Sequence, residues 1–371
     1  MIHRQEDNYR VMLVAQSLRV GGAEIMVENL AYALRRQGCV VSIVVLQAGE
    51  TLITKRLVKN GISISVLGKR KGIDVSVIGR LSKAMVNFAP DVVHSNLPVL
   101  QYVVPAAKIA GVKNLVHTVH NMADKETKSK FKRLVNKFCY RNGLVTPVAL
   151  SCANKQSVID LYNLDETDVM VVSNGIDLSA FQPKRDYRIV GKAHLCHIGR
   201  FEEAKNHLAL IAAAARLKAD GIDFVFDLYG VGSLKDDIQE AVTRNNLTGE
   251  FVFHGLTDNI PAALAGADLF VFPSLYEGMP MVLAEAMASG LPIVVSPVGG
   301  VPDMLTNGKD SLYCDLESGT LANCIEQILD DSKMRESLGI AARERAAAFS
   351  SDAMAASYLE VYRRGGDRSC L

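Results

Sequence analysis

The feature that most restricts the fold is a repeated alternation of short apolar runs with amphipathic segments of helical period. The first half holds seven runs rich in Val and Ile that are typical of β-strands, at 10–18, 40–46, 62–67, 91–95, 114–120, 147–151 and 169–175. Helices are expected between them, for example at 23–37, 75–89 and 128–142. Because strands that are apolar throughout must be covered on both faces, this alternation predicts a parallel α/β sheet.

The pattern starts again in the second half, with expected strands at 193–199, 223–230, 251–255, 268–274 and 291–296. The polar stretch 175–192 separates the two sets and is expected to be an interdomain linker. The chain is therefore predicted to form two Rossmann-like, doubly wound domains, 1–180 and 181–350, that face each other across a cleft. Residues 351–371 would be a helix and tail that cross back to the first domain. Ligands of such sheets bind at the carboxyl ends of the strands.

Composition narrows the class of protein. The 371 residues carry a net charge of +1, so no overall field attracts nucleic acid, which is not an expected partner. The seven cysteines form no C-x-x-C pair, and this predicts neither a zinc site nor a disulfide framework. The charged start, MIHRQEDNYR, is unlike a signal peptide, and no run reaches the length of a membrane span. We expect a cytoplasmic protein.

Strand ends in the second half carry residues suited to a phosphorylated ligand. Arg200 and Lys205 follow the first strand, where a guanidinium fork and a flexible ammonium suit a diphosphate. Gly230 and Gly232 follow the next strand, and Gly255 ends the third; glycines at these positions allow the backbone to approach a ligand. Considered alone, such cations are more often a solvated face, and such glycines more often make turns.

The stretch YEGMPMVLAEAMASG places two glutamates, Glu277 and Glu285, eight positions apart. Pro280 is suited to start a helix at 281–289, and Gly290 to end it. The free N–H groups of such a helix would face the turn before it and bind an anion or hydroxyls; the expected contacts come from Gly278, Met279, Pro280, Met281 and Val282. As an isolated pair, the glutamates would more simply be solvent-facing.

Four motifs resemble those of family 4 glycosyltransferases, retaining enzymes with the GT-B fold. EGMPMVLAE is similar to the family's E-x7-E signature, and GRFEEAKN to its Gly-Arg to Lys-Asn segment. SNGID (173–177) resembles the stretch before the second domain, and VGGAE (20–24) the glycine-rich loop after the first strand. The likeness covers nearly the whole chain. It favours a ligand-binding role for these residues over the simpler interpretations given above.

The resemblance implies a role for each motif residue. Arg200 and Lys205 would neutralise the diphosphate of the donor, a nucleoside-diphosphate sugar. Glu277 would bind hydroxyls of the transferred sugar, and Glu285 the ribose. The backbone near Gly22 would approach the phosphates from the first domain.

The histidines are treated separately. His120, in TVHN, lies where the family often has a histidine near the transferred sugar, although Asn121 departs from the usual Gly or Asp. It is equally compatible with a position outside the pocket. Four others lie in apolar strands and are expected to be hydrogen-bonded core or strand-end residues: His94, His117, His197 and His254.

Charge explains the expected chemistry. Cleavage of the sugar–phosphate bond builds negative charge on the leaving diphosphate, and fixed cations stabilise that transition state. The sequence has no D-x-D triplet, so we expect no metal and no other cofactor. For retention, the family implies attack on the face from which the phosphate leaves, without a required carboxylate nucleophile.

The segment 125–142 is rich in Lys and Arg, and Phe131, Leu134, Val135 and Phe138 recur at helical spacing. One interpretation is a cationic helix on an anionic membrane surface. The other, which we favour slightly from sequence, is that the apolar face packs on the first domain and only the basic face is exposed.

Together these features predict a retaining, metal-independent hexosyltransferase. Its donor would be a UDP-sugar and its acceptor a lipid-linked or glycan molecule of lipopolysaccharide, capsule or exopolysaccharide assembly. It would be cytoplasmic, at the inner face of the membrane. A UDP-sugar epimerase of the same fold and a non-catalytic sugar-nucleotide sensor remain alternatives, whereas GGAE lacks the full dinucleotide fingerprint of a dehydrogenase.

Overall fold

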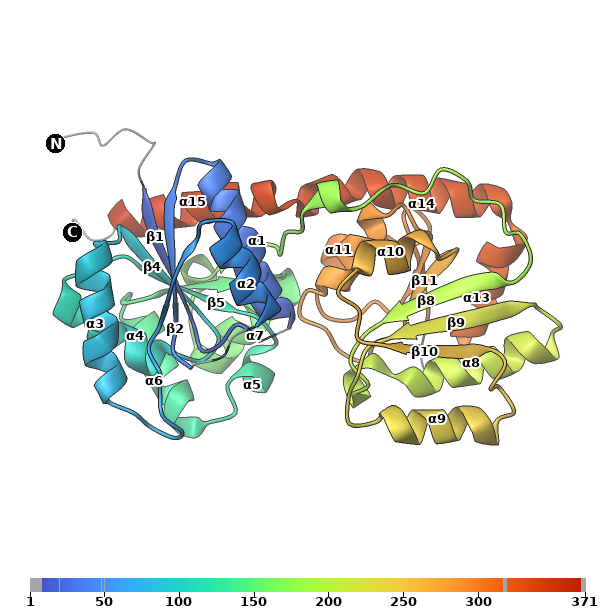
Figure 1. Ribbon diagram of the computed structural model, residues 1–371, viewed down its shortest axis with the longest axis horizontal. Coiled ribbons are helices and arrows are strands. Elements are labelled where there is room, and N and C mark those ends of the chain that lie inside the picture. Colours follow the sequence, from blue (N-terminus) through green and yellow to red (C-terminus); the bar gives the residue numbers. More distant parts are fainter. Residues whose placement is uncertain (1–8, 20, 48, 50, 316–318, 368–371) are drawn as a thin grey trace. The chain divides into compact units, whose positions relative to one another are not determined.

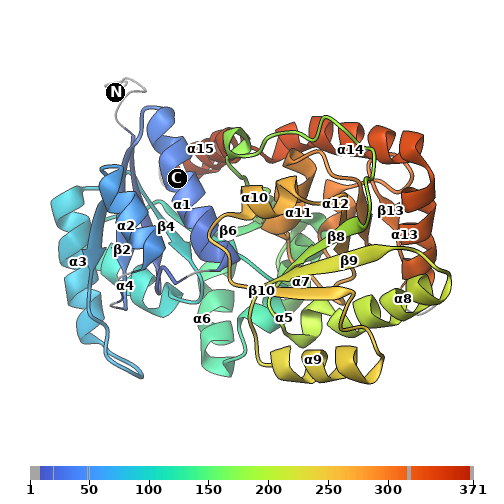
Figure 2. The same ribbon diagram turned by 45° about the vertical axis from the view of Figure 1, so that its right-hand side comes forward.

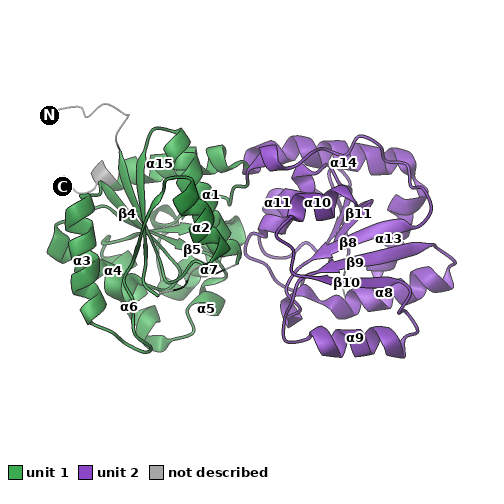
Figure 3. Cartoon of the chain, in the orientation of Figure 1, with its two compact units in different colours: residues 1–176, 350–371 green, residues 177–349 purple. Residues whose placement is uncertain are grey.

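The computed structural model describes residues 9–367 except 20, 48, 50 and 316–318. The polar start at 1–8, Val20 of the glycine-rich motif and the end of the predicted tail, 368–371, lie outside the described residues. The chain divides into two compact units, which are described separately (Figure 3). Unit 1 comprises Met1–Ile176 with Ser350–Leu371, and unit 2 comprises Asp177–Phe349. Each contains a parallel sheet between helices, which confirms the predicted α/β fold.

Unit 1 has a seven-stranded sheet in the order β3-β2-β1-β4-β5-β6-β7, with every neighbouring pair parallel. The order reverses between β1 and β4, and loops on both sides of such a point open a crevice at the carboxyl edge. The strands are β1 (Arg10–Ala15), β2 (Val40–Val45), β3 (Ser63–Val66), β4 (Val92–Asn96), β5 (Leu115–Val119), β6 (Thr146–Ala149) and β7 (Met170–Val171). The expected strand at 169–175 is thus much shorter, because the chain leaves the sheet before the polar SNGID segment.

The helices of unit 1 form two groups, one for each face of the sheet (Figures 1 and 2). The first consists of α1 (Gly22–Arg36), α2 (Leu52–Lys59) and α15 (Ser351–Asp367). The second consists of α3 (Ser76–Phe88), α4 (Leu100–Ala110), α5 (Ala123–Glu126), α6 (Lys130–Arg141) and α7 (Cys152–Tyr162). In the first group, α2 and α15 both contact α1; in the second, α3 and α6 contact α4, α7 contacts α6, and α5 contacts α7. Fully buried Val and Leu side chains fill the space between the layers.

The last helix, α15, returns from unit 2 and packs along α1. Two of its tyrosines are fully buried: the hydroxyl of Tyr358 lies 2.7 Å from Thr118 Oγ1, and that of Tyr362 lies 2.7 Å from His94 Nδ1. Gly175 of the SNGID motif lies beneath the start of the helix, where an added Cβ would be 2.5 Å from the carbonyl oxygen of Ser350. This glycine therefore allows α15 to reach its position.

Unit 2 has a six-stranded parallel sheet in the order β10-β9-β8-β11-β12-β13, which reverses between β8 and β11. Its strands are β8 (Ala193–Ile198), β9 (Phe224–Tyr229), β10 (Phe251–Gly255), β11 (Leu269–Phe272), β12 (Ile293–Val295) and β13 (Leu312–Tyr313). Its helices are α8 (His207–Ala219), α9 (Lys235–Arg244), α10 (Ile260–Ala265), α11 (Met281–Ala288), α12 (Val301–Met304), α13 (Thr320–Asp330) and α14 (Ser332–Ala346). The two-residue strand β13 was not expected, because so short a run has no readable alternation.

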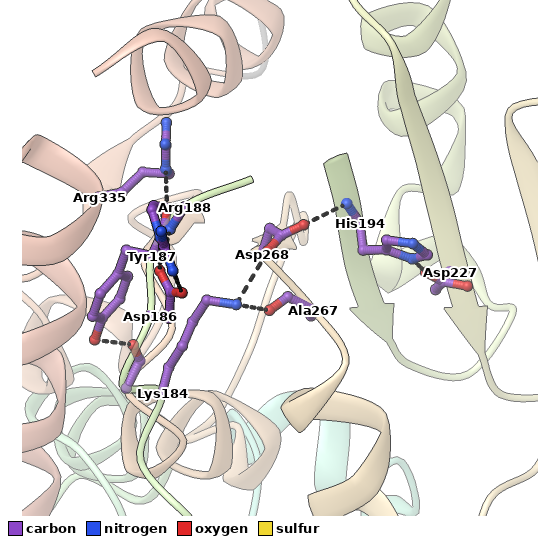
Figure 4. Close-up of polar contacts among 10 residues, drawn as sticks. Lys184, Asp186, Tyr187, Arg188, His194, Asp227, Ala267, Asp268 and Arg335 are labelled. Carbon is purple, nitrogen blue, oxygen red and sulfur yellow. Dashed lines mark hydrogen bonds and ion pairs between the residues drawn. The ribbon is translucent and has the colours of Figure 1, made fainter. Parts of the chain in front are cut away.

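The polar stretch 175–192, which the sequence assigned to an interdomain linker, contains the boundary between the two units. The unit boundary lies at its beginning, after Ile176, and the rest packs on unit 2 (Figure 4). Lys184 donates to the carbonyl of Ala267 (2.8 Å) and pairs with Asp268 (3.1 Å). The Tyr187 hydroxyl donates to Gly290 O (2.8 Å), and Arg335 Nε donates to Tyr187 O (3.0 Å).

The orientation of α6 corrects the interpretation that we favoured from sequence. Phe131, Leu134 and Phe138 are exposed by 60%, 68% and 60%, whereas the buried side of the helix carries Cys139 and Tyr140. Of the four apolar residues at helical spacing, these three therefore face solvent, whereas Val135 is partly buried and packs against the core of unit 1. Within the described ranges, no helix combines the length and the apolar character needed to span a bilayer.

Candidate active site

The most distinctive side-chain pair in unit 2 joins two loops at the point where the strand order reverses. The loop after β8 ends in a short turn, Glu203–Lys205, and the loop after β11 carries Glu277. Because β8 and β11 are neighbours, their carboxyl ends bring these loops together. The backbone joins them as well, since Leu275 donates its N–H to the carbonyl of Ala204 (2.8 Å).

Lys205 and Glu277 form a close ion pair, with 2.5 Å between Nζ and Oε1. Their side chains are only 17% and 12% exposed, so solvent screens the pair much less than a surface pair. The ammonium also lies 4.6 Å from the centre of the Phe272 ring. An ammonium has three donors, so Lys205 can hold Glu277 and still bind a second anionic group. The sequence placed both residues in one site but did not reveal this contact.

Arg200, the other predicted cation, is placed differently. Its side chain is exposed, and its guanidinium makes no hydrogen bond or ion pair within the described part of the chain. The structure therefore does not join Arg200 to the Lys205–Glu277 pair. Its predicted role at the diphosphate stays a prediction.

Glu285 lies in the second turn of α11 and is 8% exposed. Burial raises the pKa of its carboxyl to about 7, because a charged group in a low-dielectric interior loses its hydration. The preceding turn is buried at Gly278, Met279, Pro280 and Met281, while Val282 is partly exposed. Pro280 stands just before the helix rather than inside it, and its carbonyl oxygen accepts the N–H of Leu283 (3.1 Å). The N–H groups of the two residues before Leu283, Met281 and Val282, lack intrahelical acceptors.

A glycine that sequence reasoning missed supports the loop that carries Glu277. Gly299 has a φ of 56°, and a Cβ there would be 1.8 Å from the carbonyl oxygen of Glu277. The next residue, Gly300, donates its N–H to Gly278 O (2.9 Å). Only glycine allows this approach, so the GG pair at 299–300, a few residues after β12 and following Pro297, was the available signal.

The three predicted phosphate-loop glycines differ in their surroundings. A Cβ on Gly230 would be 1.9 Å from the carbonyl of Gly199, and one on Gly232 would be 2.3 Å from that of Phe201. These two glycines therefore let the loop after β9 pack against the loop that leads to Lys205. Gly255 has a φ of 73° and no heavy atom within 4 Å of an added Cβ, so it borders open space.

Two buried histidines lie beside Lys205 and were not assigned to the site. His197 Nδ1 lies 2.8 Å from Val271 O, but its Nε2 and both ring nitrogens of His207 have no hydrogen-bond partner among the described residues. Burial, with the charge of Lys205, lowers the pKa of His207 to about 4, and that of His197 also lies well below its ordinary value. Both rings are therefore neutral at pH 7. His197 is a buried, hydrogen-bonded strand residue, as expected, although only one of its ring nitrogens has a partner among the described residues.

In unit 1, His120 follows β5 and its Nε2 lies 3.0 Å from Oδ1 of Asn96, the last residue of β4. The amide nitrogen of Asn96 is buried and has no partner among the described residues. The next residue, Leu97, has a φ of 64°, a strained conformation that often marks functional sites. Burial lowers the pKa of His120 to about 4, so its ring is neutral at pH 7.

Glu126 fixes the backbone at His120. One of its carboxylate oxygens accepts the N–H groups of His120 (2.5 Å) and Asn121 (2.9 Å), while Asn154 donates to Asn121 O (2.5 Å). Burial raises the pKa of Glu126 to about 7, although these two hydrogen bonds act in the opposite direction. Sequence reasoning missed Asn96 and Glu126, because neither belongs to a motif.

The remaining predicted residues take simpler places. Gly22 is the first residue of α1, and an added Cβ there would meet no atom within 4 Å, so the helix start is open. His94 and His117 are buried and hydrogen-bonded, as expected. His254 is exposed near the end of β10, and its Nε2 lies 2.7 Å from Asp227 Oδ1. Within the described ranges, no three His, Cys, Asp or Glu side chains are grouped as metal ligands.

Two family profiles match consecutive parts of the chain. Residues 20–180 match the family described as Glycosyltransferase Family 4, and residues 182–345 match Glycosyl transferases group 1. The chain belongs to the family 4 glycosyltransferases. Its two doubly wound sheets are those of the GT-B fold, as the sequence predicted.

Named relatives of this family 4 chain come from bacteria. It is 34% identical to the putative glycosyltransferase EpsF of Bacillus subtilis (strain 168) over 53% of this chain and 54% of the relative. It is 32% identical to the UDP-Gal:alpha-D-GlcNAc-diphosphoundecaprenol alpha-1,3-galactosyltransferase of Escherichia coli over 61% of this chain and 62% of the relative. The matches thus span less than two thirds of either relative. The crystal structure of Anabaena HepE in complex with UDP and glucose has the same fold, with a TM-score of 0.83 and 20% identity over 96% of this chain and 100% of that one.

Proposed function

We propose that this protein is a glycosyltransferase that moves a sugar, with retention of configuration, from a UDP-sugar to a lipid-linked or glycan acceptor. The acceptor belongs to bacterial cell-surface polysaccharide assembly (lipopolysaccharide, capsule or exopolysaccharide), and the reaction takes place in the cytoplasm at the inner face of the membrane. The relatives' names support this proposal, since one describes a UDP-sugar donor and a diphosphoundecaprenol-linked acceptor.

The Lys205–Glu277 pair is the observation that carries the proposal. In a nucleoside-diphosphate sugar, the sugar is bonded directly to the second phosphate. A protein group that binds the phosphate and one that binds the sugar must therefore be neighbours. Lys205 and Glu277, which suit the phosphate and the sugar hydroxyls respectively, are 2.5 Å apart at the carboxyl edge of the sheet.

The proposed mechanism uses these two charges in turn. As the bond between sugar and phosphate breaks, negative charge grows on the diphosphate, and Lys205 stabilises it more strongly than in the ground state. Glu277 accepts hydrogen bonds from the sugar hydroxyls, which fixes the face that the acceptor attacks. The departing phosphate oxygen takes the acceptor's proton on that same face. This route needs neither a protein nucleophile nor a divalent metal, and Arg200 adds positive charge when the donor is bound.

Glu285 and His120 have supporting roles in this proposal. The buried Glu285 carboxylate accepts hydrogen bonds from the ribose hydroxyls, which replace the water that burial removes. His120, neutral at pH 7, donates or accepts a hydrogen bond at the transferred sugar from unit 1. Backbone N–H groups at 278–282 and near Gly22 bind donor oxygens.

A transfer assay with matched variants tests the proposal. The full chain is incubated with UDP-, GDP- and ADP-sugars, with and without lipid-linked acceptor from a membrane extract and with and without EDTA, and the product anomer is determined by NMR. Lys205→Gln and Glu277→Gln should each lower turnover at least about 100-fold. Lys218→Gln is the control, because Lys218 and Glu250 form an ion pair of similar length (2.9 Å) in the same unit, away from these loops.

The possible results separate the proposal from its rivals. Donor consumption only with acceptor, the same anomer in product and donor, and no effect of EDTA support it. An epimerised UDP-sugar without acceptor would identify an epimerase, and tight donor binding with no turnover would identify a sensor. Near-normal rates in both Lys205→Gln and Glu277→Gln would refute the proposed active site.

A further inference from the structure

The exposed apolar residues of α6 form a continuous stripe. Phe131, Leu134 and Phe138 lie at positions i, i+3 and i+7, so they share one face of the helix, and all three are at least 60% exposed. We call them the α6 stripe. Two aromatic rings and a leucine side by side in solvent are unfavourable in water, and clusters of this kind mark interaction sites.

Positive charge surrounds the α6 stripe without any negative charge on the helix. From residue 128 to residue 141 the chain carries six basic residues and no Asp or Glu: Lys128, Lys130, Lys132, Arg133, Lys137 and Arg141. Ser129 caps the start of the helix, so even that position, where an acidic residue would be favoured, is uncharged. The stripe is therefore apolar at its centre and cationic at its margins.

A second segment of unit 1 has the same character. The loop between β3 and α3, residues 67–75, holds Lys69, Arg70 and Lys71, and Ile73 and Val75 are exposed by 83% and 71%. We call it the β3–α3 loop. Its one acid, Asp74, is buried and paired with Arg80 (3.2 Å), so it offers no negative charge to the surface.

The two segments meet at the start of α4. Lys132 of α6 donates to Pro98 O (3.4 Å), and the Lys69 ammonium of the β3–α3 loop lies 5.6 Å from the centre of the Tyr102 ring. Burial lowers the pKa of Lys132, and the charge of Lys69 lowers it further, because the two ammonium groups are close. In Figures 1 and 2 the tip of the loop and one end of α6 both reach the bottom of unit 1.

We propose that the α6 stripe and the β3–α3 loop together form one surface that binds the headgroup region of an anionic lipid bilayer. The apolar side chains enter the boundary between headgroups and acyl chains, while the lysines and arginines contact the lipid phosphates. The proposal deepens the proposed function, because a lipid-linked acceptor lies in such a membrane and both segments follow strands at the carboxyl edge of the unit 1 sheet.

Other occupants fit this surface less well. A second copy of the chain would bring six or more like charges together around a small apolar centre. Nucleic acid would accept the charges but would leave the α6 stripe in water. An anionic bilayer satisfies both the apolar and the cationic parts at once.

Vesicle flotation with the full chain tests the apolar part. The vesicles are phosphatidylcholine with about 30% phosphatidylglycerol, compared with phosphatidylcholine alone. Replacing the α6 stripe (Phe131→Ser, Leu134→Ser, Phe138→Ser) should lower the partition coefficient at least about 10-fold. The control is Val86→Ser with Ile109→Ser, which lie near the far ends of α3 and α4 and are exposed by 60% and 68%, as are the residues of the stripe.

The same assay tests the charged part. Lys69→Gln, Arg70→Gln and Lys71→Gln together should lower binding to the anionic vesicles about 100-fold at low salt and much less at high salt. The control neutralises three exposed lysines at the opposite edge of the sheet, Lys59→Gln, Lys108→Gln and Lys113→Gln, and should retain most of the binding.

Three results would overturn the proposal. They are equal binding to neutral and anionic vesicles, wild-type binding by the α6 stripe variant, and a dimer in sedimentation that the stripe variant converts to monomer. Transfer to a short, water-soluble acceptor separates this proposal from the proposed function. Both surface variants should keep wild-type rates on that acceptor; if the wild-type chain transfers nothing to it, the proposed function fails, while the vesicle result still decides the docking surface.

Discussion

Replacement of the buried Glu285 by glutamine should stabilise unit 2 at neutral pH and leave it unchanged in acid. The pKa of Glu285 rises from an ordinary value of 4.5 to about 7 because its carboxyl is buried. Each pKa unit corresponds to about 1.4 kcal/mol, so keeping this carboxylate ionised in the folded protein costs about 3 kcal/mol. Glutamine has the shape of the neutral acid and removes that cost.

The direction with pH follows from proton binding. Between pH 4.5 and 7 the folded state holds the proton of Glu285 while the unfolded state has lost it, so the free energy of unfolding falls as pH rises through this range. Below pH 4.5 both states are protonated, and Glu285→Gln should match the wild type. At pH 8 the variant should be more stable by about 3 kcal/mol.

The assay must report unit 2 alone, because Glu126 in unit 1 also has a pKa of about 7. Urea unfolding followed by hydrogen–deuterium exchange of peptides from 281–295 meets this need, measured at pH 4.5 and pH 8 for both proteins. The same variant should bind UDP-sugar more weakly, since it loses the acceptor for the ribose hydroxyls. A stability difference that is absent at pH 8, or equal at both pH values, would refute the reasoning.

Three further predictions concern the loops. Gly232→Ala should lower the free energy of unfolding of unit 2 by at least about 2 kcal/mol, because its Cβ would be 2.3 Å from a backbone oxygen. Gly255 borders open space, so Gly255→Ala should cost only about 1 kcal/mol, for its positive φ. Urea titration of both variants tests this difference. Glu126→Ala should lower kcat about 10-fold and increase amide exchange at 120–127. Because a single Glu126 oxygen accepts both N–H groups, Glu126→Gln should restore both kcat and exchange. A loss of activity without faster exchange would contradict this positioning role. Gly175→Ala should increase amide exchange in α15 and leave α11 unchanged, and unaltered exchange in α15 would contradict the packing role of this glycine.

Much of the fold follows from sequence because buried parallel strands carry a strong signal. The expected strands at 40–46, rich in Val, and at 193–199 differ from β2 and β8 by one residue at most. The site was predicted less completely. Lys205 and Glu277 could be placed at strand ends, but their contact depends on β8 and β11 being neighbours, which the strand order decides and the local sequence does not.

Other features could not be predicted because one signal has two physical meanings. A glycine after a strand fits either the approach of a ligand or close backbone packing. Gly230 packs against the carbonyl of Gly199, whereas Gly255 borders open space, and the residue type alone does not distinguish the two cases. The helical period of α6 revealed an apolar stripe but not its direction. That direction is set by the fit of Tyr140 and Asn136 against Tyr162, whose hydroxyl accepts a hydrogen bond from Asn136 (3.2 Å).

A crystal structure of the chain with a non-hydrolysable UDP-sugar tests the central claim most directly. The proposed site predicts a diphosphate oxygen within about 3 Å of Lys205 Nζ and a sugar hydroxyl at a similar distance from the Glu277 carboxylate. A donor bound elsewhere, with the Lys205–Glu277 pair intact and facing only water, would contradict it.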